Sequence, residues 1–168
     1  LGLTLLFSLN FWAQEHNRYL QNRTYTYEET IAIYANFASK HPNLCALKAI
    51  GPSDYGKELY VFLLNKTANF STENLHQSNV LLINNAIHPG EPCGVDASIK
   101  LVEKLLEAPN KFPDNVTLAI IPIYNVGGAH NRGCCSRANQ NGPEEYGFRG
   151  NAKNLDLNRD FIKADSKN

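Results

Sequence analysis

Residues 80–125 read VLLINNAIHPGEPCGVDASIKLVEKLLEAPNKFPDNVTLAIIPIYN, and this stretch decides the fold. Its first part, residues 80–88, is a nearly continuous apolar run, which is typical of a strand covered on both faces. Residues 95–108 place apolar side chains on one face of a predicted helix, and residues 116–125 form a second apolar run. A strand, a helix and a strand in this order predict two parallel strands joined by a right-handed crossover.

The segment before this unit predicts one more helix and a hairpin. Thr26 and Glu29 have the spacing of a capping box, ahead of a helical pattern of apolar residues that ends at Pro42. Residues 45–51 and 58–65 are β-rich runs separated by a turn, which predicts an antiparallel pair. The predicted class is therefore α/β, with a mixed, mostly parallel β-sheet flanked by helices and no second domain.

Composition excludes some classes of partner. The chain has 168 residues, enough for one domain with a hydrophobic core, and its net charge is +0. A protein that binds nucleic acid non-specifically needs a basic surface, so no nucleic-acid partner is expected.

The first residues predict export. Residues 1–14, LGLTLLFSLNFWAQ, are apolar and uncharged, and this run resembles the hydrophobic part of a signal peptide whose charged start is missing. The alternative is a buried first helix or strand. The run is too short to cross a bilayer, so we expect no stable membrane span. We expect residues 15–168 to form the mature part of a secreted or periplasmic protein.

Four cysteines would then meet an oxidising compartment, in which disulfides form. Cys134 and Cys135 are neighbours in the sequence, and we do not expect them to bond to each other. One of them could pair with Cys45 or Cys93, but the spacing does not decide which.

Polar residues follow both strands of the βαβ unit. His88 and Glu91 come directly after the first strand, and a segment rich in Gly, Asn and Arg follows the second from Asn125 onward. Ligands of open α/β sheets bind at the carboxyl ends of the strands, so these residues should lie close together. An imidazole and a carboxylate are usual zinc ligands. The alternative is a structural pair, in which Glu91 caps a helix and His88 is hydrogen-bonded at a strand end.

Arg149, Asn158 and Arg159 lie in the downstream segment and could hold an anion. Arginine offers two parallel donors to a carboxylate, and asparagine adds a third. The alternative is that both arginines form surface ion pairs with nearby acidic residues such as Asp156.

The motifs HPGE (residues 88–91), YNVGG (124–128) and RGNAKNLDLNRDF (149–161) occur in this order and at strand ends. Together with IGPSDYGKELYVFLL (50–64), they resemble the zinc carboxypeptidases of the funnelin type. The resemblance covers about residues 25–165. It implies the zinc-carboxypeptidase (phosphorylase/hydrolase-like) fold, with residues 15–168 forming the N-terminal part of a peptidase catalytic domain.

The resemblance also implies roles for these residues. His88 and Glu91 would be two of three ligands of one Zn²⁺ ion, and Arg149 would stabilise the oxyanion. Asn158 and Arg159 would hold the free C-terminal carboxylate of a peptide substrate whose last amide bond is hydrolysed. In the family the third ligand, a histidine, and the general-base glutamate follow the Asn-Arg pair much later. We therefore expect an inactive fragment, cut at both ends, of a longer enzyme.

The chain departs from the family pattern in its NVGG turn, where only Asn125 matches. His130 could substitute as third ligand but stands at the wrong place in the order, and an exposed loop position is favoured for it. Two other functions stay open. One is a related amidohydrolase that acts on N-acyl amino acids or peptidoglycan stems, and the other is a non-catalytic relative that binds peptides or carbohydrates.

Overall fold

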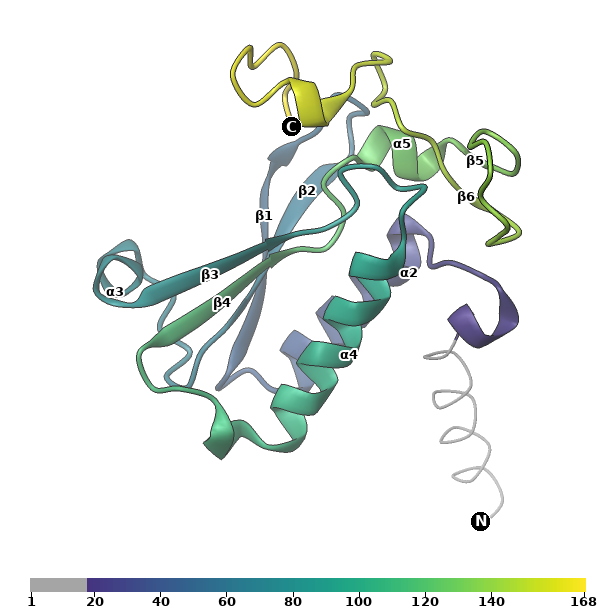
Figure 1. Ribbon diagram of the computed structural model, residues 1–168. Coiled ribbons are helices and arrows are strands. Elements are labelled where there is room, and N and C mark those ends of the chain that lie inside the picture. The colour runs from purple at the N-terminus through teal and green to yellow at the C-terminus, as the bar shows by residue number, and fades with distance from the viewer. Residues whose placement is uncertain (1–17) are drawn as a thin grey trace, which may run out of the picture.

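The computed structural model describes residues 18–168, and it has a mixed α/β architecture in which helices pack on a β-sheet (Figure 1). The predicted signal peptide, residues 1–14, lies outside the described residues. Within residues 18–168 no helix combines the length and the apolar character needed to cross a membrane.

The main sheet has four strands in the order β1-β2-β4-β3. The predicted hairpin is confirmed, because β1 and β2 pair in antiparallel register with Leu47 opposite Phe62. The predicted βαβ unit is also confirmed, since β3 and β4 run parallel with Leu81 opposite Leu118. β2 and β4 are antiparallel, so two of the three pairings are antiparallel and the sheet is less parallel than expected. The strands are β1 (Cys45–Pro52), β2 (Glu58–Leu64), β3 (Asn79–Asn84) and β4 (Val116–Ile121).

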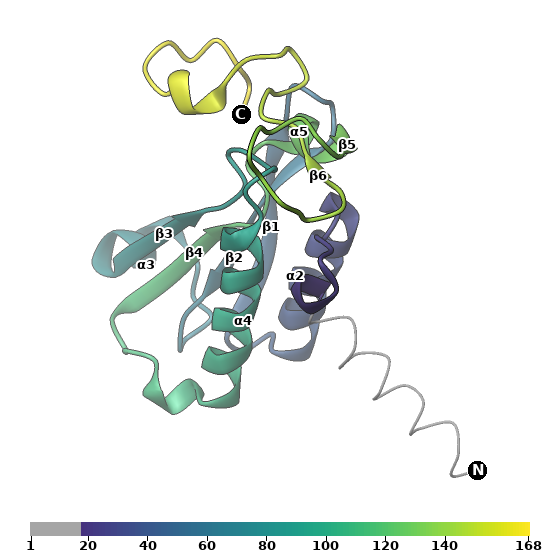
Figure 2. The same cartoon turned by 45° about the vertical axis from the view of Figure 1, so that its right-hand side comes forward.

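The two long helices are α2 (Tyr27–Lys40) and α4 (Cys93–Glu107), and they lie on the same side of the sheet (Figures 1 and 2). The capping box of α2 forms as predicted, with the Thr26 side chain accepting from the Glu29 backbone and the Glu29 side chain accepting from Thr26. Tyr34 of α2 packs on Phe62 of β2 with ring centroids 5.0 Å apart. The helices thus bury their apolar faces against β2 and β4 in one core.

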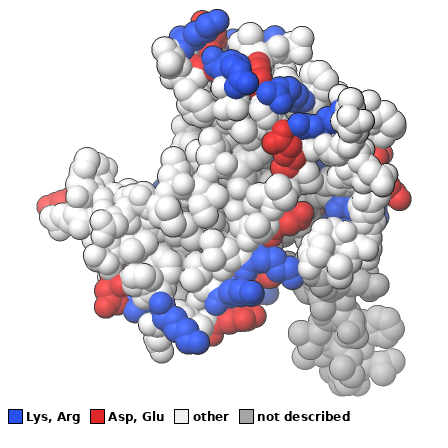
Figure 3. All heavy atoms as spheres, viewed as in Figure 1, with Lys and Arg blue, Asp and Glu red and all other residues white. Residues whose placement is uncertain are grey.

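β3 differs from the expectation of a strand covered on both faces. Val80, Leu81 and Leu82 are 48%, 57% and 58% exposed, respectively. The reason is the strand order, which places β3 at the edge, with β4 on one side and no strand on the other within residues 18–168. Figure 3 shows this side of the molecule as a largely uncharged surface.

Shorter elements lie at both ends of the sheet. They are η1 (Arg18–Gln21), α3 (Thr72–Gln77), η2 (Pro109–Lys111), α5 (Val126–His130), β5 (Arg132–Gly133), β6 (Tyr146–Gly147) and η3 (Leu157–Arg159). α3 and η2 directly precede β3 and β4, whereas α5, β5, β6 and η3 follow β4. β5 and β6 pair across a loop, residues 134–145. The expectation for the cysteines is wrong, because Cys134 and Cys135 bond to each other while Cys45 and Cys93 are free. The two neighbours lie in a turn of this loop where Cys135 has a φ of 67°.

Candidate active site

The candidate site forms where the chain continues beyond β3 and β4. The two extensions remain hydrogen-bonded, with the Tyr124 amide donating to the Asn85 carbonyl at 2.9 Å and the Asn125 amide to the Ala86 carbonyl at 3.1 Å. This pairing carries the His88 turn and the start of α5 to the same end of the sheet (Figure 1), as expected for parallel strands.

His88 is the buried centre of the site, with only 5% of its surface exposed. Its Nε2 atom lies 2.8 Å from Oδ1 of Asp156, and its Nδ1 atom lies 3.5 Å from Oε1 of Glu91. An ionised carboxylate only accepts hydrogen bonds, so Nε2 carries the hydrogen and Nδ1 of the neutral ring carries the lone pair. The free lone pair therefore lies on the Glu91 side of the ring.

Asp156 joins His88 to Arg149. The Nε and Nη2 atoms of Arg149 donate to Oδ2 of Asp156 at 3.0 and 2.9 Å. Burial alone would raise the pKa of Asp156, but the hydrogen bonds from His88, Arg149 and the Asn158 amide outweigh it and lower this pKa to about 2. Asp156 is thus an anion at neutral pH that the His88 imidazole and the Arg149 guanidinium group share.

Glu91 is held on its other side by an arginine. Oε1 of Glu91 accepts a hydrogen bond from Nη2 of Arg137 in the loop between β5 and β6. Burial would raise the pKa of Glu91, but the hydrogen bond from Arg137 and the positive charges of Arg137 and Arg149 lower it instead. The carboxylate is therefore ionised and placed beside Nδ1 of His88.

Asn125 connects the backbones on which these side chains stand. It is fully buried, and its Nδ2 atom donates to the carbonyls of Ile87 at 3.3 Å and Arg149 at 2.9 Å. Its Oδ1 atom accepts from the Gly128 amide at 2.8 Å, which caps α5. One side chain thus fixes the position of Arg149 relative to the strand end that precedes His88.

Asn158 and Arg159 lie in η3, directly after Asp156, and both are exposed. The Asn158 amide donates to Oδ1 of Asp156 at 3.0 Å, and Nη1 of Arg159 donates to the Asn158 carbonyl at 3.0 Å. The five residues predicted from the motifs, His88, Glu91, Arg149, Asn158 and Arg159, are therefore brought to one end of the sheet.

Comparison with known proteins identifies the family of this chain. The sequence model of the zinc carboxypeptidases matches residues 30–168. The chain belongs to the zinc carboxypeptidase family. A comparison with curated proteins gave no match.

Solved structures of carboxypeptidases share the fold. The metallo-carboxypeptidase from Burkholderia cenocepacia superposes with a TM-score of 0.59 at 21% identity, covering 83% of this chain and 33% of that one. Carboxypeptidase A from Helicoverpa armigera gives 0.56 at 20% identity, covering 66% and 26%. Bovine thrombin-activatable fibrinolysis inhibitor, in complex with tick carboxypeptidase inhibitor, gives 0.53 at 19%, covering 64% and 33%. The chain thus spans about a quarter to a third of the length of these three proteins.

The donors of this family member suit a zinc ion. A histidine nitrogen with a free lone pair and an ionised glutamate oxygen face each other 3.5 Å apart, and both are usual zinc ligands. The ring nitrogen on the far side is hydrogen-bonded to a carboxylate, which is the common arrangement for a zinc-binding histidine. No set of three or more metal-binding side chains lies together within residues 18–168.

Two residues of this site, Asp156 and Arg137, are not among those predicted from the sequence. The sequence favours Asp156 only as an ion-pair partner of the arginines, although its place between the RGN and NR motifs indicates a role. Arg137 was not singled out, because no local pattern connects the loop between β5 and β6 with Glu91. The position of His130 also differs from the prediction, which favours an exposed loop for this residue. His130 ends α5, is stacked on Tyr55 at 4.6 Å and lies next to Tyr27, so it does not join His88.

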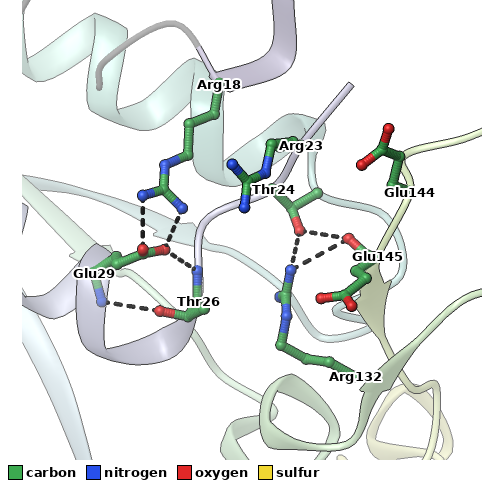
Figure 4. A pocket seen from close by; sticks show the side chains of 8 residues that line it. All are labelled: Arg18, Arg23, Thr24, Thr26, Glu29, Arg132, Glu144 and Glu145. Carbon is green, nitrogen blue, oxygen red and sulfur yellow. Dashed lines mark hydrogen bonds and ion pairs between the residues drawn. The ribbon is translucent and has the colours of Figure 1, made fainter. Parts of the chain in front are cut away.

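A separate pocket of about 380 Å³ lies between the segment before α2 and the β5–β6 pair (Figure 4). Both Nη atoms of Arg18 lie 2.7 Å from the carboxylate of Glu29, and Arg132 donates to the side chain of Thr24 and to the Glu145 carbonyl. These contacts hold residues 18–26 against the loop, which is a structural role.

Proposed function

We propose that the whole protein containing this chain is a zinc-dependent carboxypeptidase, which hydrolyses the last amide bond of a peptide. The observation that carries the proposal is the contact of His88 with Asp156 on one side and Glu91 on the other, in a chain of the zinc carboxypeptidase family. A buried histidine, oriented by one carboxylate and facing a second, is suited to bind a metal. Glu91 is not the cap of α4, because the N-cap is Pro92 and no side-chain cap hydrogen bond forms.

In this proposal His88 and Glu91 hold one Zn²⁺ ion. When bound, the ion lowers the pKa of a water molecule and polarises the scissile carbonyl. Asp156 keeps the imidazole in one orientation, so that the lone pair of Nδ1 stays available. Within residues 18–168 no set of three or more metal-binding side chains lies together, so His88 and Glu91 would supply only part of the coordination of the ion.

Arg149 stabilises the negative charge that forms on the carbonyl oxygen. Its side chain is 44% exposed, so a substrate can reach it, and its two bonds to Asp156 fix the plane of the guanidinium. A preorganised donor of this kind contributes a factor of about 10² to 10³ to the rate.

Asn158 and Arg159 bind the free carboxylate at the end of the peptide. Their side chains are exposed on η3, two and three residues after Asp156, and this position supports a carboxylate site next to the proposed metal ligands. Arginine and asparagine together offer the donors that a carboxylate needs. This pair restricts the enzyme to the last residue of the substrate.

We also propose that the protein is exported. The support is the apolar, uncharged composition of residues 1–14 followed by a polar stretch. Fractionation of the source cells, with detection of the mature N-terminus, tests this proposal, and a protein found intact in the cytoplasm would contradict it.

The experiment for the proposed activity compares two peptides that differ only at the C-terminus, one a free acid and the other an amide. The whole protein should cleave the free acid faster by at least about tenfold, and the change Arg159→Gln should remove most of that difference. Lys163→Gln is a matched control, because Lys163 lies four residues later on the same exposed segment. Equal cleavage of both peptides by the unchanged protein would contradict a carboxypeptidase and favour an endopeptidase or amidohydrolase.

A further inference from the structure

The loop between β5 and β6, residues 134–145, is fastened over the turn that carries the proposed zinc ligands. Nε2 of Gln140 donates to the Gly90 carbonyl at 3.0 Å, and the Gly147 amide, just after the loop, donates to the Pro89 carbonyl at 3.4 Å. The third contact is the charged bond between Arg137 and Glu91. Two anchors that follow Arg137 in the chain, Gln140 and Gly147, thus hold this loop at the turn that carries Glu91.

Gly90 provides the space that the Arg137 side chain fills. A Cβ atom on Gly90 would lie 2.9 Å from Cδ and 3.1 Å from Nη1 of Arg137, and 2.9 Å from the Gly147 carbonyl oxygen. Real Cβ atoms do not approach other atoms so closely. The absence of a side chain at Gly90 thus allows an arginine from another part of the chain to lie over the turn.

A pocket of about 280 Å³ opens next to this arginine, and no acidic residue lines it. Its lining residues are Ser136, Arg137, Ala138, Phe148 and Arg149. Two guanidinium groups thus face one small space. Nη2 of Arg137 is bonded to Glu91, whereas Nη1 is buried against the Gly90 turn and has no hydrogen-bond partner within residues 18–168. A buried donor without a partner is costly, so the guanidinium group, which lines this pocket, would gain from one more acceptor there.

The order of residues across the site gives the direction of a bound peptide. Asp156 contacts His88 on one side and the start of η3 on the other. η3 carries Asn158 and Arg159. Glu91 lies on the opposite side of His88, with Arg137 beyond it. A peptide held at its C-terminus by η3, with its scissile carbonyl at His88, therefore extends its upstream residues toward Arg137.

We propose that Arg137 is a specificity-determining residue, which binds an acidic side chain upstream of the scissile bond. The inference rests on the proposed carboxypeptidase function. A metal ion bound at Glu91 would share the negative charge of this carboxylate with Arg137. The net charge around Arg137 would then be more positive. Arginine holds a carboxylate through two parallel hydrogen bonds, and Arg149 at the rim of the same pocket adds to the attraction.

The experiment uses the whole protein and peptides that differ only by Glu or Gln at successive positions upstream of the scissile bond. At one position the Glu peptide should have a kcat/KM higher by about tenfold, with most of the difference in KM, because the contact is remote from the reacting atoms. Arg137→Gln should reduce the ratio between the two peptides to about one. The ratio is the readout, so a general loss of activity in the variant does not affect it.

Arg132→Gln is the matched control, because this arginine belongs to the same β5–β6 unit but contacts Thr24 and Tyr25 instead of the turn. It should leave the Glu/Gln ratio unchanged, and thermal unfolding of both variants checks that the loop is intact. A ratio that survives in Arg137→Gln would overturn the inference. Loss of zinc from the Arg137→Gln variant with an unchanged Glu/Gln ratio would also overturn the inference, because Arg137 would then only position Glu91.

The outcomes separate the two proposals. Hydrolysis of free-acid peptides without any preference for Glu would overturn the role of Arg137 and leave the proposed function standing. Absence of C-terminal hydrolysis with every peptide would overturn both.

Discussion

The Nε2 atom of His88 lies 2.8 Å from Oδ1 of Asp156, a residue that is 68 positions later in the chain. This contact joins the turn after β3 to the segment that carries Arg149, Asn158 and Arg159. It fixes the imidazole so that Nδ1 lies on the side of Glu91, and it gives the buried ring a polar partner. Two motifs that are separate in the sequence thereby become one site.

Removing this carboxylate should weaken metal binding. In the whole protein, Asp156→Ala should lower zinc affinity by about 10- to 100-fold, because a zinc-binding histidine that loses its carboxylate partner loses orientation and basicity. Competition with a chromogenic chelator measures the affinity. Asp160→Asn is the control, since the Asp160 carboxylate accepts from the amides of Asp165 and Ser166 and does not contact His88. Equal affinities for both variants would contradict the role of Asp156.

The buried Asn125 side chain should contribute strongly to stability. Asn125→Ala removes partners from the Ile87 and Arg149 carbonyls and the Gly128 amide. A buried group left unpaired costs about 1–3 kcal/mol, so the free energy of unfolding should fall by about 2–4 kcal/mol in denaturant titrations. Asn110→Ala, at an exposed position, is the control and should change it by less than about 0.5 kcal/mol. A comparable loss for both would show that Asn125 has no special role.

Asp96, in the first turn of α4, should make stability depend on pH. Burial raises its pKa from 3.8 to about 6, so the folded protein disfavours the charged form. Stability should therefore fall as the pH rises from about 4 to 6 and stay constant above. Asp96→Asn should remove this slope and stabilise the protein above pH 6 by about 1–2 kcal/mol, a value reduced for solvent screening and for the favourable helix N-terminus. Unfolding titrations at pH 4, 5, 6 and 7 measure the slope. A slope that persists in Asp96→Asn would contradict this assignment.

The exposed edge of β3 should make the isolated 168-residue chain associate. Val80, Leu81 and Leu82 present apolar side chains beside an edge without a neighbouring strand in residues 18–168, and such edges pair with other chains. Leu81→Lys should shift the sedimentation profile toward the monomer. Leu101→Lys changes an exposed leucine of α4 instead and should have little effect. A monomeric unchanged chain at micromolar concentration would contradict the expectation.

Features that depend on local sequence could be predicted, and those that depend on distant contacts could not. The capping box of Thr26 and Glu29 and the parallel pair of β3 and β4 follow from spacing and apolar periodicity, and both are observed. The apolar run of β3 correctly indicated a strand, but burial depends on the neighbouring strands, which a local pattern does not reveal. The bond between Arg137 and Glu91 joins residues 46 apart, so no motif contained it.

The disulfide between Cys134 and Cys135 shows the same limit. Neighbouring cysteines are not expected to bond, because their Cα atoms lie 3.8 Å apart, closer than in most disulfides. Whether they bond depends on the backbone of a turn, and the positive φ of Cys135 could not be predicted from residue types alone.

The central claim is that His88 and Glu91 bind a catalytic zinc ion. The most direct test is the zinc content of the whole protein, measured by atomic emission after dialysis, together with its hydrolysis of a peptide with a free C-terminus. The unchanged protein should hold one zinc ion per chain and cleave the peptide, whereas His88→Ala and Glu91→Ala should lose both the zinc and the activity. Full retention of zinc in both variants would contradict the claim.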